Sequence, residues 1–306
     1  MSILLASSVV RGSTQGESHG GVYLVDFEGE SVAQVIDYNR GDIDWQGRGW
    51  DRGLRGMAFD GERIYVAASD ELFVYNPQFK LLNSWRNPFL KHCHEIYVHE
   101  RRLYLTSTGF DAVLGFDLDK LEFSWGMHIS RFGGGYKGNP FNPASSQGPI
   151  PSNDLHLNSV FCTDKGMFIS GLKTAGVLVY NGRQIKQWVQ LPAGTHNARP
   201  HNGGVLYNDT RADRVCFQSK TSNIGLAVPT YPQQQLTHTD LDDSRVARQG
   251  FGRGLCCIKD QLIAAGSSPS TITLYDFEAR ERRASVTLSY DIRNAIHGLE
   301  VWPFAG

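Results

Sequence analysis

The sequence predicts an all-β protein, a six-bladed β-propeller. Six segments begin alike, each with a histidine or an arginine that opens a run typical of a β-strand. Successive segments start 39 to 62 residues apart, which is the length of a four-stranded blade that packs only against its neighbours. Strand-like runs also recur about every ten residues, as antiparallel strands joined by tight turns require. The segments begin at Arg55, His94, His156, His201, Arg253 and His297.

The two ends of the chain are expected to share the closing blade. The sixth segment, from His297, reaches the last residues of the sequence before it has supplied four strands. Residues 3–10 and 20–27 are strand-like and precede the first full repeat. We therefore predict one propeller domain over residues 1–306, with its last blade built from both termini.

The second and third repeats show the strands most clearly. Strands are predicted at residues 56–60, 63–69, 72–76, 95–99, 102–108 and 112–118, with turn formers between them. Residues 128–154 contain four prolines and a glycine run, which favours a long irregular loop leading to His156. Residues 228–252 precede Arg253 in the same way. Each loop is either a lid over a site or a solvent-exposed insertion, and helices should be few and short.

Composition narrows the function. A formal net charge of −1 argues against general binding to nucleic acid or to an anionic membrane. The sequence has no run of ~18 apolar residues of the kind that spans a bilayer. The five cysteines are odd in number, form no CxxC pair and lie in strand-like runs, so we expect reduced, buried thiols and a cytoplasmic protein.

The equivalent position of each repeat should point at the propeller axis, which brings residues distant in sequence to one site. Imidazole is a ligand for zinc, iron and copper. We predict a transition metal held by His94, His156 and His201, with His297 as a fourth ligand or an acid–base residue. Two alternatives stay open: a polar or anionic ligand site without metal, and a structural polar plug.

Arg55 and Arg253 cannot ligate a metal, but the guanidinium fork suits a carboxylate, phosphate or sulfate. They are therefore predicted to clamp an anionic substrate, unless each pairs with a local acid. Asp154 shares its strand face with His156, so its carboxylate is a candidate for orienting that imidazole or for general-base catalysis.

The short motifs at the strand starts resemble an uncharacterised group of bacterial proteins. They are His94-Glu95, His156-Leu157-Asn158, Pro200-His201 and Arg253-Gly254-Leu255. The resemblance spans residues 55–258 and implies the ring of blades, but it implies no reaction.

These observations predict a metal-dependent enzyme that acts on a small anionic metabolite, as an oxygenase or oxidoreductase or as a hydrolase or lyase. The alternatives are a non-catalytic propeller that binds a carboxylated or phosphorylated ligand, and a protein-interaction platform. Neither nucleic acid nor membrane is an expected partner, and the oligomeric state is left open.

Overall fold

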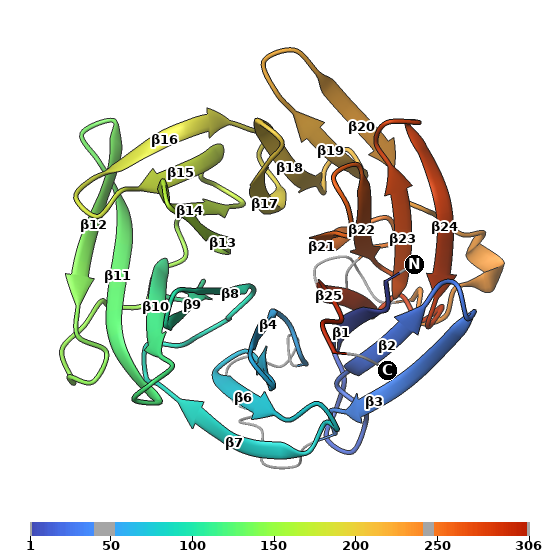
Figure 1. Cartoon of the computed structure of the whole chain (residues 1–306), viewed down its shortest axis with the longest axis horizontal. Helices are drawn as coiled ribbons and strands as arrows, with labels where there is room; N and C mark the ends of the chain where they lie inside the picture. Colours follow the sequence, from blue (N-terminus) through green and yellow to red (C-terminus); the bar gives the residue numbers. More distant parts are fainter. Residues whose placement is uncertain (1, 40–52, 241–247, 305–306) are drawn as a thin grey trace. The chain divides into compact units, whose positions relative to one another are not determined.

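A computed structural model describes residues 2–39, 53–240 and 248–304. The chain is all-β and forms a six-bladed β-propeller with one antiparallel sheet for each repeat (Figure 1). It divides into two compact units. Residues 56–211 form what we call the central unit, and residues 1–55 with 212–306 form what we call the terminal unit. The single-domain organisation of residues 1–306 stays a prediction.

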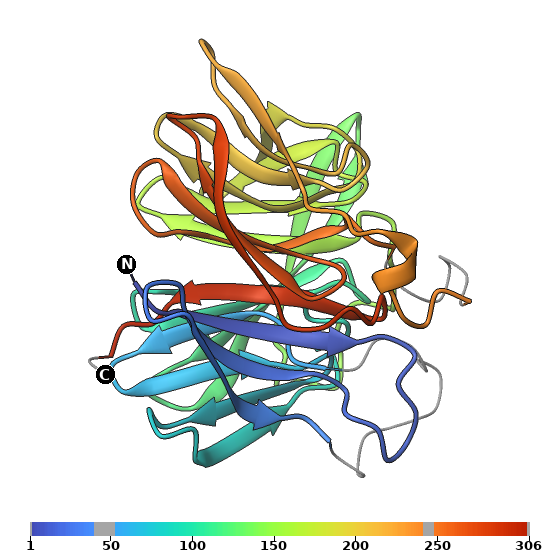
Figure 2. The ribbon, with the colours of Figure 1, turned by 90° about the vertical axis from the view of Figure 1, so that its right-hand side faces the viewer.

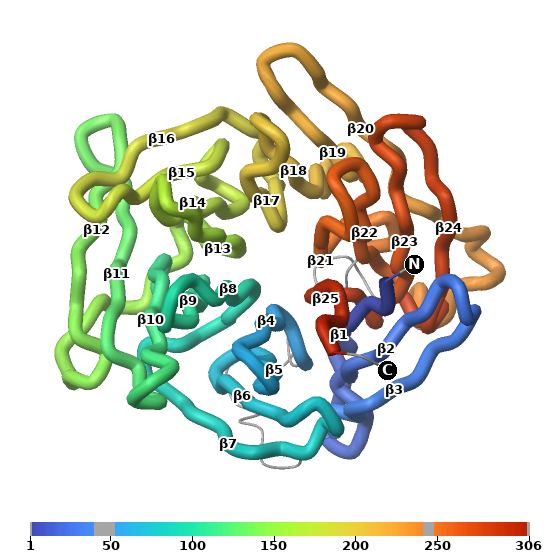
Figure 3. The backbone as a smooth tube through the Cα atoms, in the orientation of Figure 1, coloured from blue at the N-terminus to red at the C-terminus, as the bar shows by residue number. Residues whose placement is uncertain are grey.

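The central unit contains three complete sheets and the first half of a fourth. In the first three, the strands are β4 (Met57–Asp60), β5 (Arg63–Ala67), β6 (Glu71–Tyr75) and β7 (Leu81–Arg86); β8 (Ile96–His99), β9 (Arg102–Ser107), β10 (Ala112–Asp117), β11 (Glu122–Phe132) and β12 (Gly135–Phe141); and β13 (Leu157–Thr163), β14 (Gly166–Gly171), β15 (Gly176–Tyr180) and β16 (Ile185–Gln190). The fourth begins with β17 (Thr195–His201) and β18 (Gly204–Asp209). The first strands β4, β8, β13 and β17 contact one another in that order and follow one edge of this unit (Figure 3).

The terminal unit holds the remaining strands. They are β19 (Arg214–Gln218) and β20 (Asn223–Ala227), which complete the fourth sheet; β21 (Gly252–Cys257), β22 (Leu262–Ser267), β23 (Thr271–Asp276) and β24 (Glu281–Thr287); and β25 (Asn294–Val301) with β1 (Leu4–Val10), β2 (Gly21–Asp26) and β3 (Ser31–Asp37). The last strand, β25, pairs antiparallel with the first, β1, from Leu4 opposite Val301 to Val10 opposite Asn294. Figure 2 shows the two strands side by side. The prediction that both termini build the closing blade is confirmed.

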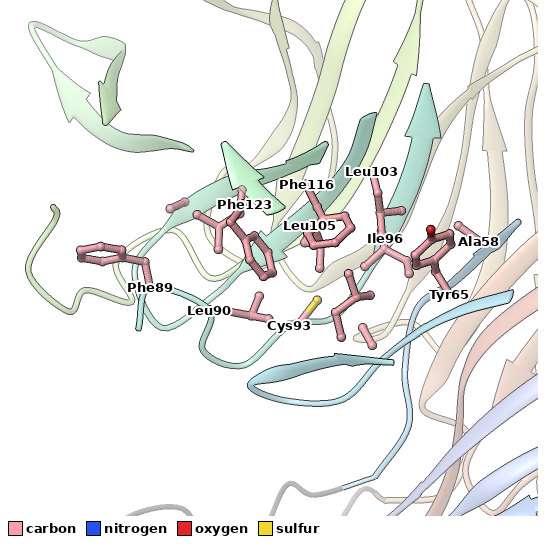
Figure 4. Packing of buried hydrophobic residues seen from close by; sticks show 14 of the residues in the cluster. Ala58, Tyr65, Phe89, Leu90, Cys93, Ile96, Leu103, Leu105, Phe116 and Phe123 are labelled. Carbon is pink, nitrogen blue, oxygen red and sulfur yellow. The ribbon is translucent and has the colours of Figure 1, made fainter. Parts of the chain in front are cut away.

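The fourth strands β3 and β7 are more exposed than the strands inside their sheets. Every residue of β1 and β6 is buried, whereas β3 and β7 are mostly exposed. Within each unit, apolar side chains fill the space between facing sheets. Between the sheets β4–β7 and β8–β12 this core includes Tyr65, Leu105 and Phe116 (Figure 4).

The expectation of an irregular loop over residues 128–154 is wrong for its first part. Strands β11 and β12 form a long hairpin from Gly126 opposite Phe141 to Phe132 opposite Gly135. Gly133 and Gly134 form its two-residue turn with φ of 55° and 79°, values that suit glycine in a hairpin turn. Residues 142–154 lie outside regular strands, as predicted.

Helices are few among the described residues, as predicted. The described residues contain one 3-10 helix, η1 (Gln233–Gln235), within residues 228–252, and residues 241–247 of that loop lie outside the description. Within the described ranges, no helix is long and apolar enough to span a membrane.

Candidate functional site

The six residues that open the repeats are called the marked residues here, and five of them lie before or in the first half of the first strand of a sheet. Arg55 and His94 stand two residues before β4 and β8, and His156 directly precedes β13. Arg253 is the second residue of β21, and His297 is the fourth of the eight residues of β25. The register of several of these strands shifts there. His297 has no Cα partner between the pairs Ile296–Ser8 and Gly298–Ser7, and similar shifts occur in β13, β17 and β21. Such β-bulges redirect side chains at a strand end.

His201 is the exception. It lies at the far end of β17, opposite Gly204 and next to the turn into β18. The histidine at the start of β17 is His196, which is 2% exposed. The sequence interpretation therefore took the wrong histidine as the one equivalent to His156, because the pairs His196-Asn197 and His201-Asn202 look alike and only the register separates them.

His94 and His156 lie together in the central unit. Their rings meet edge to face with centroids 5.5 Å apart. Nδ1 of His94 is 2.7 Å from the carbonyl oxygen of His92 and 2.9 Å from Oγ1 of Thr108. A carbonyl can only accept, so Nδ1 carries the proton and Nε2 is the acceptor in the neutral imidazole. The Thr108 hydroxyl donates to the carbonyl oxygen of Leu157 and ties β13 to the same place.

Asp111 fixes the backbone around His156. This buried carboxylate accepts hydrogen bonds from three consecutive backbone N–H groups, those of Asp154, Leu155 and His156, at 2.6, 3.1 and 2.9 Å. His156 itself has a φ of 54°, an uncommon conformation for a residue other than glycine. Its Nδ1 lies 2.9 Å from Oδ1 of Asn153. In the sequence, Asp111 lies among predicted turn formers, and these hydrogen bonds to the backbone before β13 were not predicted.

Asp154 contributes its backbone N–H to this arrangement, and its side chain is exposed. The carboxylate nearest to His94 along the chain, that of Glu95, is in contrast mostly buried, with 15% of its side chain exposed. Oε1 of Glu95 accepts a hydrogen bond of 3.0 Å from Nδ2 of Asn197 and lies 3.6 Å from Nη2 of Arg199. Asn197 in turn accepts from Nδ2 of Asn208 at 3.0 Å.

The terminal unit brings together Arg253, His297 and Arg55, which are 5%, 4% and 0% exposed. Nη1 of Arg253 donates to Nε2 of His297, so that imidazole is neutral with its proton on Nδ1. The Arg253 guanidinium also lies over the Phe251 ring, 4.7 Å from its centroid. Metal ligation through Nε2 of His297 would require Arg253 to move.

Close backbone contacts hold Arg55 beside His297. The Ser7 hydroxyl accepts a 2.9 Å hydrogen bond from the N–H of Gly298 and donates to the carbonyl oxygen of Arg55. A Cβ on Gly298 would collide with that same oxygen, so only glycine permits the approach. Arg253 on β21, His297 on β25 and the backbone of Arg55 are thus neighbours in this unit. Convergence of all six marked residues on one site stays a prediction.

No set of three or more histidine, cysteine, aspartate or glutamate side chains within residues 2–39, 53–240 and 248–304 has a geometry that could hold a metal ion. His94 and His156 each present Nδ1 to an oxygen atom, an orientation found both in metal ligands and in buried polar residues. His196 shares it, through a 3.2 Å contact from Nδ1 to the carbonyl oxygen of Gly194.

Comparisons with known proteins support the fold alone. No protein-family model matches the chain, and no curated protein is significantly similar to it in sequence. Among solved structures, a protein of unknown function from Bacteroides caccae has a TM-score of 0.58 at 10% identity and covers 98% of each chain. The C-terminal WD40 domain of Sif2 has a TM-score of 0.52 at 10% identity, over 99% of this chain and 93% of that domain. The chain spans 64% of the length of Kluyvelomyces marxianus Hsv2, at a TM-score of 0.42 and 12% identity.

Proposed function

We propose that this propeller binds a small anionic metabolite through Arg55 and Arg253 of the terminal unit. The observation that carries the proposal is a pair of buried arginines in this unit: the Arg253 guanidinium donates to His297, and the Arg55 backbone lies beside the strand that carries His297. Positive charge is costly to bury, and an anion bound by these guanidinium groups would offset that cost. The planar fork of arginine favours a carboxylate or a tetrahedral oxyanion as that ligand.

Thermal denaturation with phosphate, sulfate and succinate, each in the presence of a chelator, tests the proposal. An anion that binds the folded state raises the midpoint of unfolding in proportion to the logarithm of its concentration. We expect such a rise for the wild type and its loss in Arg253→Gln. The control is Arg283→Gln, because Arg283 is an exposed arginine of the same sheet that pairs with Asp276. Equal rises in both variants would exclude Arg253 as the anion-binding residue.

Metal-assisted turnover is the second candidate, with iron, zinc or copper as the metal. It is favoured by the orientation of His94 and His156, which lie in contact and each present Nδ1 to an oxygen. Metal-binding histidines are commonly held by just such a bond from the second ring nitrogen. Glu95 would then be the general-base candidate in the same unit, since its carboxylate is mostly buried beside amide donors.

Elemental analysis of protein purified without an affinity tag tests the metal. The proposal requires a stoichiometric transition metal that is lost in His94→Ala and His156→Ala but kept in His201→Ala, because His201 lies at the other end of its strand. If the wild-type protein contains no metal and anions still raise its unfolding midpoint, the anion-binding function is retained and the metal-assisted function is excluded.

We place the protein in the cytoplasm as part of this proposal. None of the five cysteines forms a disulfide, and four of them are buried. A reducing compartment keeps such thiols reduced.

A further inference from the structure

The central unit has a second concave site, at the opposite ends of strands β8 and β13 from His94 and His156. It is a cleft of about 490 Å³ between the sheets β8–β12 and β13–β16. This volume suits a single small molecule. Its lining includes Arg102, Tyr104, Trp125, Cys162, Met167 and Tyr180.

Two rows of side chains form the walls of this cleft. On one sheet, Gly115 pairs with Tyr104 on one side and with Trp125 on the other, and the two rings stand edge to face with centroids 6.0 Å apart. On the other sheet, Met167 pairs with Cys162 and with Tyr180. Aromatic, thioether and thiol groups therefore face each other, and such surfaces favour a flat apolar ring.

Gly115 gives the first wall its shape. A Cβ at this position would lie 2.8 Å from Cδ of Arg102 and 3.3 Å from Cε3 of Trp125. The missing side chain lets the aliphatic stem of Arg102 lie across the sheet, beside the Trp125 ring. A larger residue would displace Arg102 from the cleft.

Arg102 is the polar group of this wall. Its Nε is buried and has no hydrogen-bond partner among the described residues. A buried donor of this kind costs stability unless an acceptor reaches it. The Tyr104 hydroxyl and the Asp117 carboxylate also interact with this guanidinium. The acids at the rim, Glu100 and Asp164, are exposed, so water screens their charges. Burial also raises the pKa of the Cys162 thiol to about 12.

We propose that this cleft binds a small aromatic carboxylate, with its ring against the half-buried rings of Trp125 and Tyr180 and its carboxylate on Arg102. The ring would replace water over the aromatic and sulfur groups. The carboxylate would accept from the guanidinium of Arg102, including the Nε that now lacks an acceptor. This site is separate from the anion site proposed for the terminal unit and involves none of its residues.

Ligand-observed NMR with phenylacetate, indole-3-acetate and 4-hydroxybenzoate tests the site. We expect saturable binding of at least one of these probes, and at least tenfold weaker binding of its neutral amide. Arg102→Gln should weaken binding tenfold or more. Arg101→Gln should not, because the neighbouring Arg101 is exposed and pairs with Asp60 and Asp119.

Gly115→Ala provides a second variant that keeps the charge of Arg102. It should also weaken binding at least tenfold, with thermal denaturation used to show that the variant is folded. The proposal is overturned if none of the three acids binds, or if the folded Arg102→Gln and Gly115→Ala variants bind as the wild type does.

Discussion

Glu95 and Asn197 are 102 positions apart, yet Oε1 of Glu95 accepts a 3.0 Å hydrogen bond from Nδ2 of Asn197. The whole sheet β13–β16 separates the two residues along the chain. Side chains at the starts of first strands therefore reach past the neighbouring sheet in the central unit. This long-range contact is the physical basis for treating those strand starts as a candidate site.

A double-mutant cycle measures this contact. Glu95→Ala and Asn197→Gly remove the two side chains, and glycine suits position 197 because Asn197 has a φ of 52°. Hydrogen bonds to charged groups contribute about 1.5–3 kcal/mol, so we expect a coupling free energy of at least about 1 kcal/mol in urea unfolding. Additive single effects would show that the contact contributes nothing to stability.

Gly298→Ala tests the approach of β25 to Arg55. The added Cβ would collide with the Arg55 carbonyl oxygen, a backbone atom that cannot move without its strand. We expect a loss of about 3 kcal/mol or more in the free energy of unfolding. Gly135→Ala is the control, since the nearest atom to its new Cβ lies 3.7 Å away. A tolerated Gly298→Ala would contradict the described packing of the terminal unit.

The lowered pKa of His128 should make the folding stability of the protein depend on pH. Burial lowers the pKa of this imidazole, and Asp111 only partly opposes the effect. The unfolded chain therefore binds a proton at a pH where the folded chain does not, so stability is lost as the pH falls below about 6.5. Relative to the wild type, His128→Gln should gain stability between pH 8 and pH 5 in urea unfolding. A difference that stays constant with pH would refute this assignment.

The cysteines should differ sharply in reactivity. Cys257 is half-buried, whereas Cys93, Cys162, Cys216 and Cys256 are buried. Only the thiolate reacts with iodoacetamide, and burial raises the pKa of Cys162 to about 12. Peptide mapping by mass spectrometry at pH 8 should find Cys257 modified at least tenfold faster than Cys162. Comparable rates would mean that the Cys162 thiol is open to solvent.

The repeats made most of the fold predictable. The spacing of the strand starts and the alternation in residues 63–69 and 102–108 predicted β5 and β9, and the incomplete sixth segment predicted the pairing of β25 with β1. These signals are local or periodic patterns of apolar and turn-forming residues in the sequence. The β11–β12 hairpin was not predicted, because Gly133 and Gly134 were interpreted as part of an irregular loop rather than as a tight turn.

The site was only partly predictable. The strand starts marked by Arg253 and His297 come together in the terminal unit, and those marked by His94 and His156 come together in the central unit. Which of His196 and His201 lies at the start of β17 depends on how that strand pairs with β18. The sequence does not decide this, because both histidines are followed by asparagine. The contributions of Asp111 and Asn208 depend on contacts across many residues, for which the sequence holds no local pattern.

Anomalous diffraction from crystals soaked in selenate tests the proposed anion site most directly. Selenate has the size and charge of sulfate, and its selenium atom can be located without reference to the protein structure. We predict an anomalous peak within hydrogen-bond distance of the Arg253 guanidinium in the wild type, and we expect this peak to be absent in Arg253→Gln. A wild-type map with selenate bound elsewhere on the protein and none at Arg253 or Arg55 would contradict it.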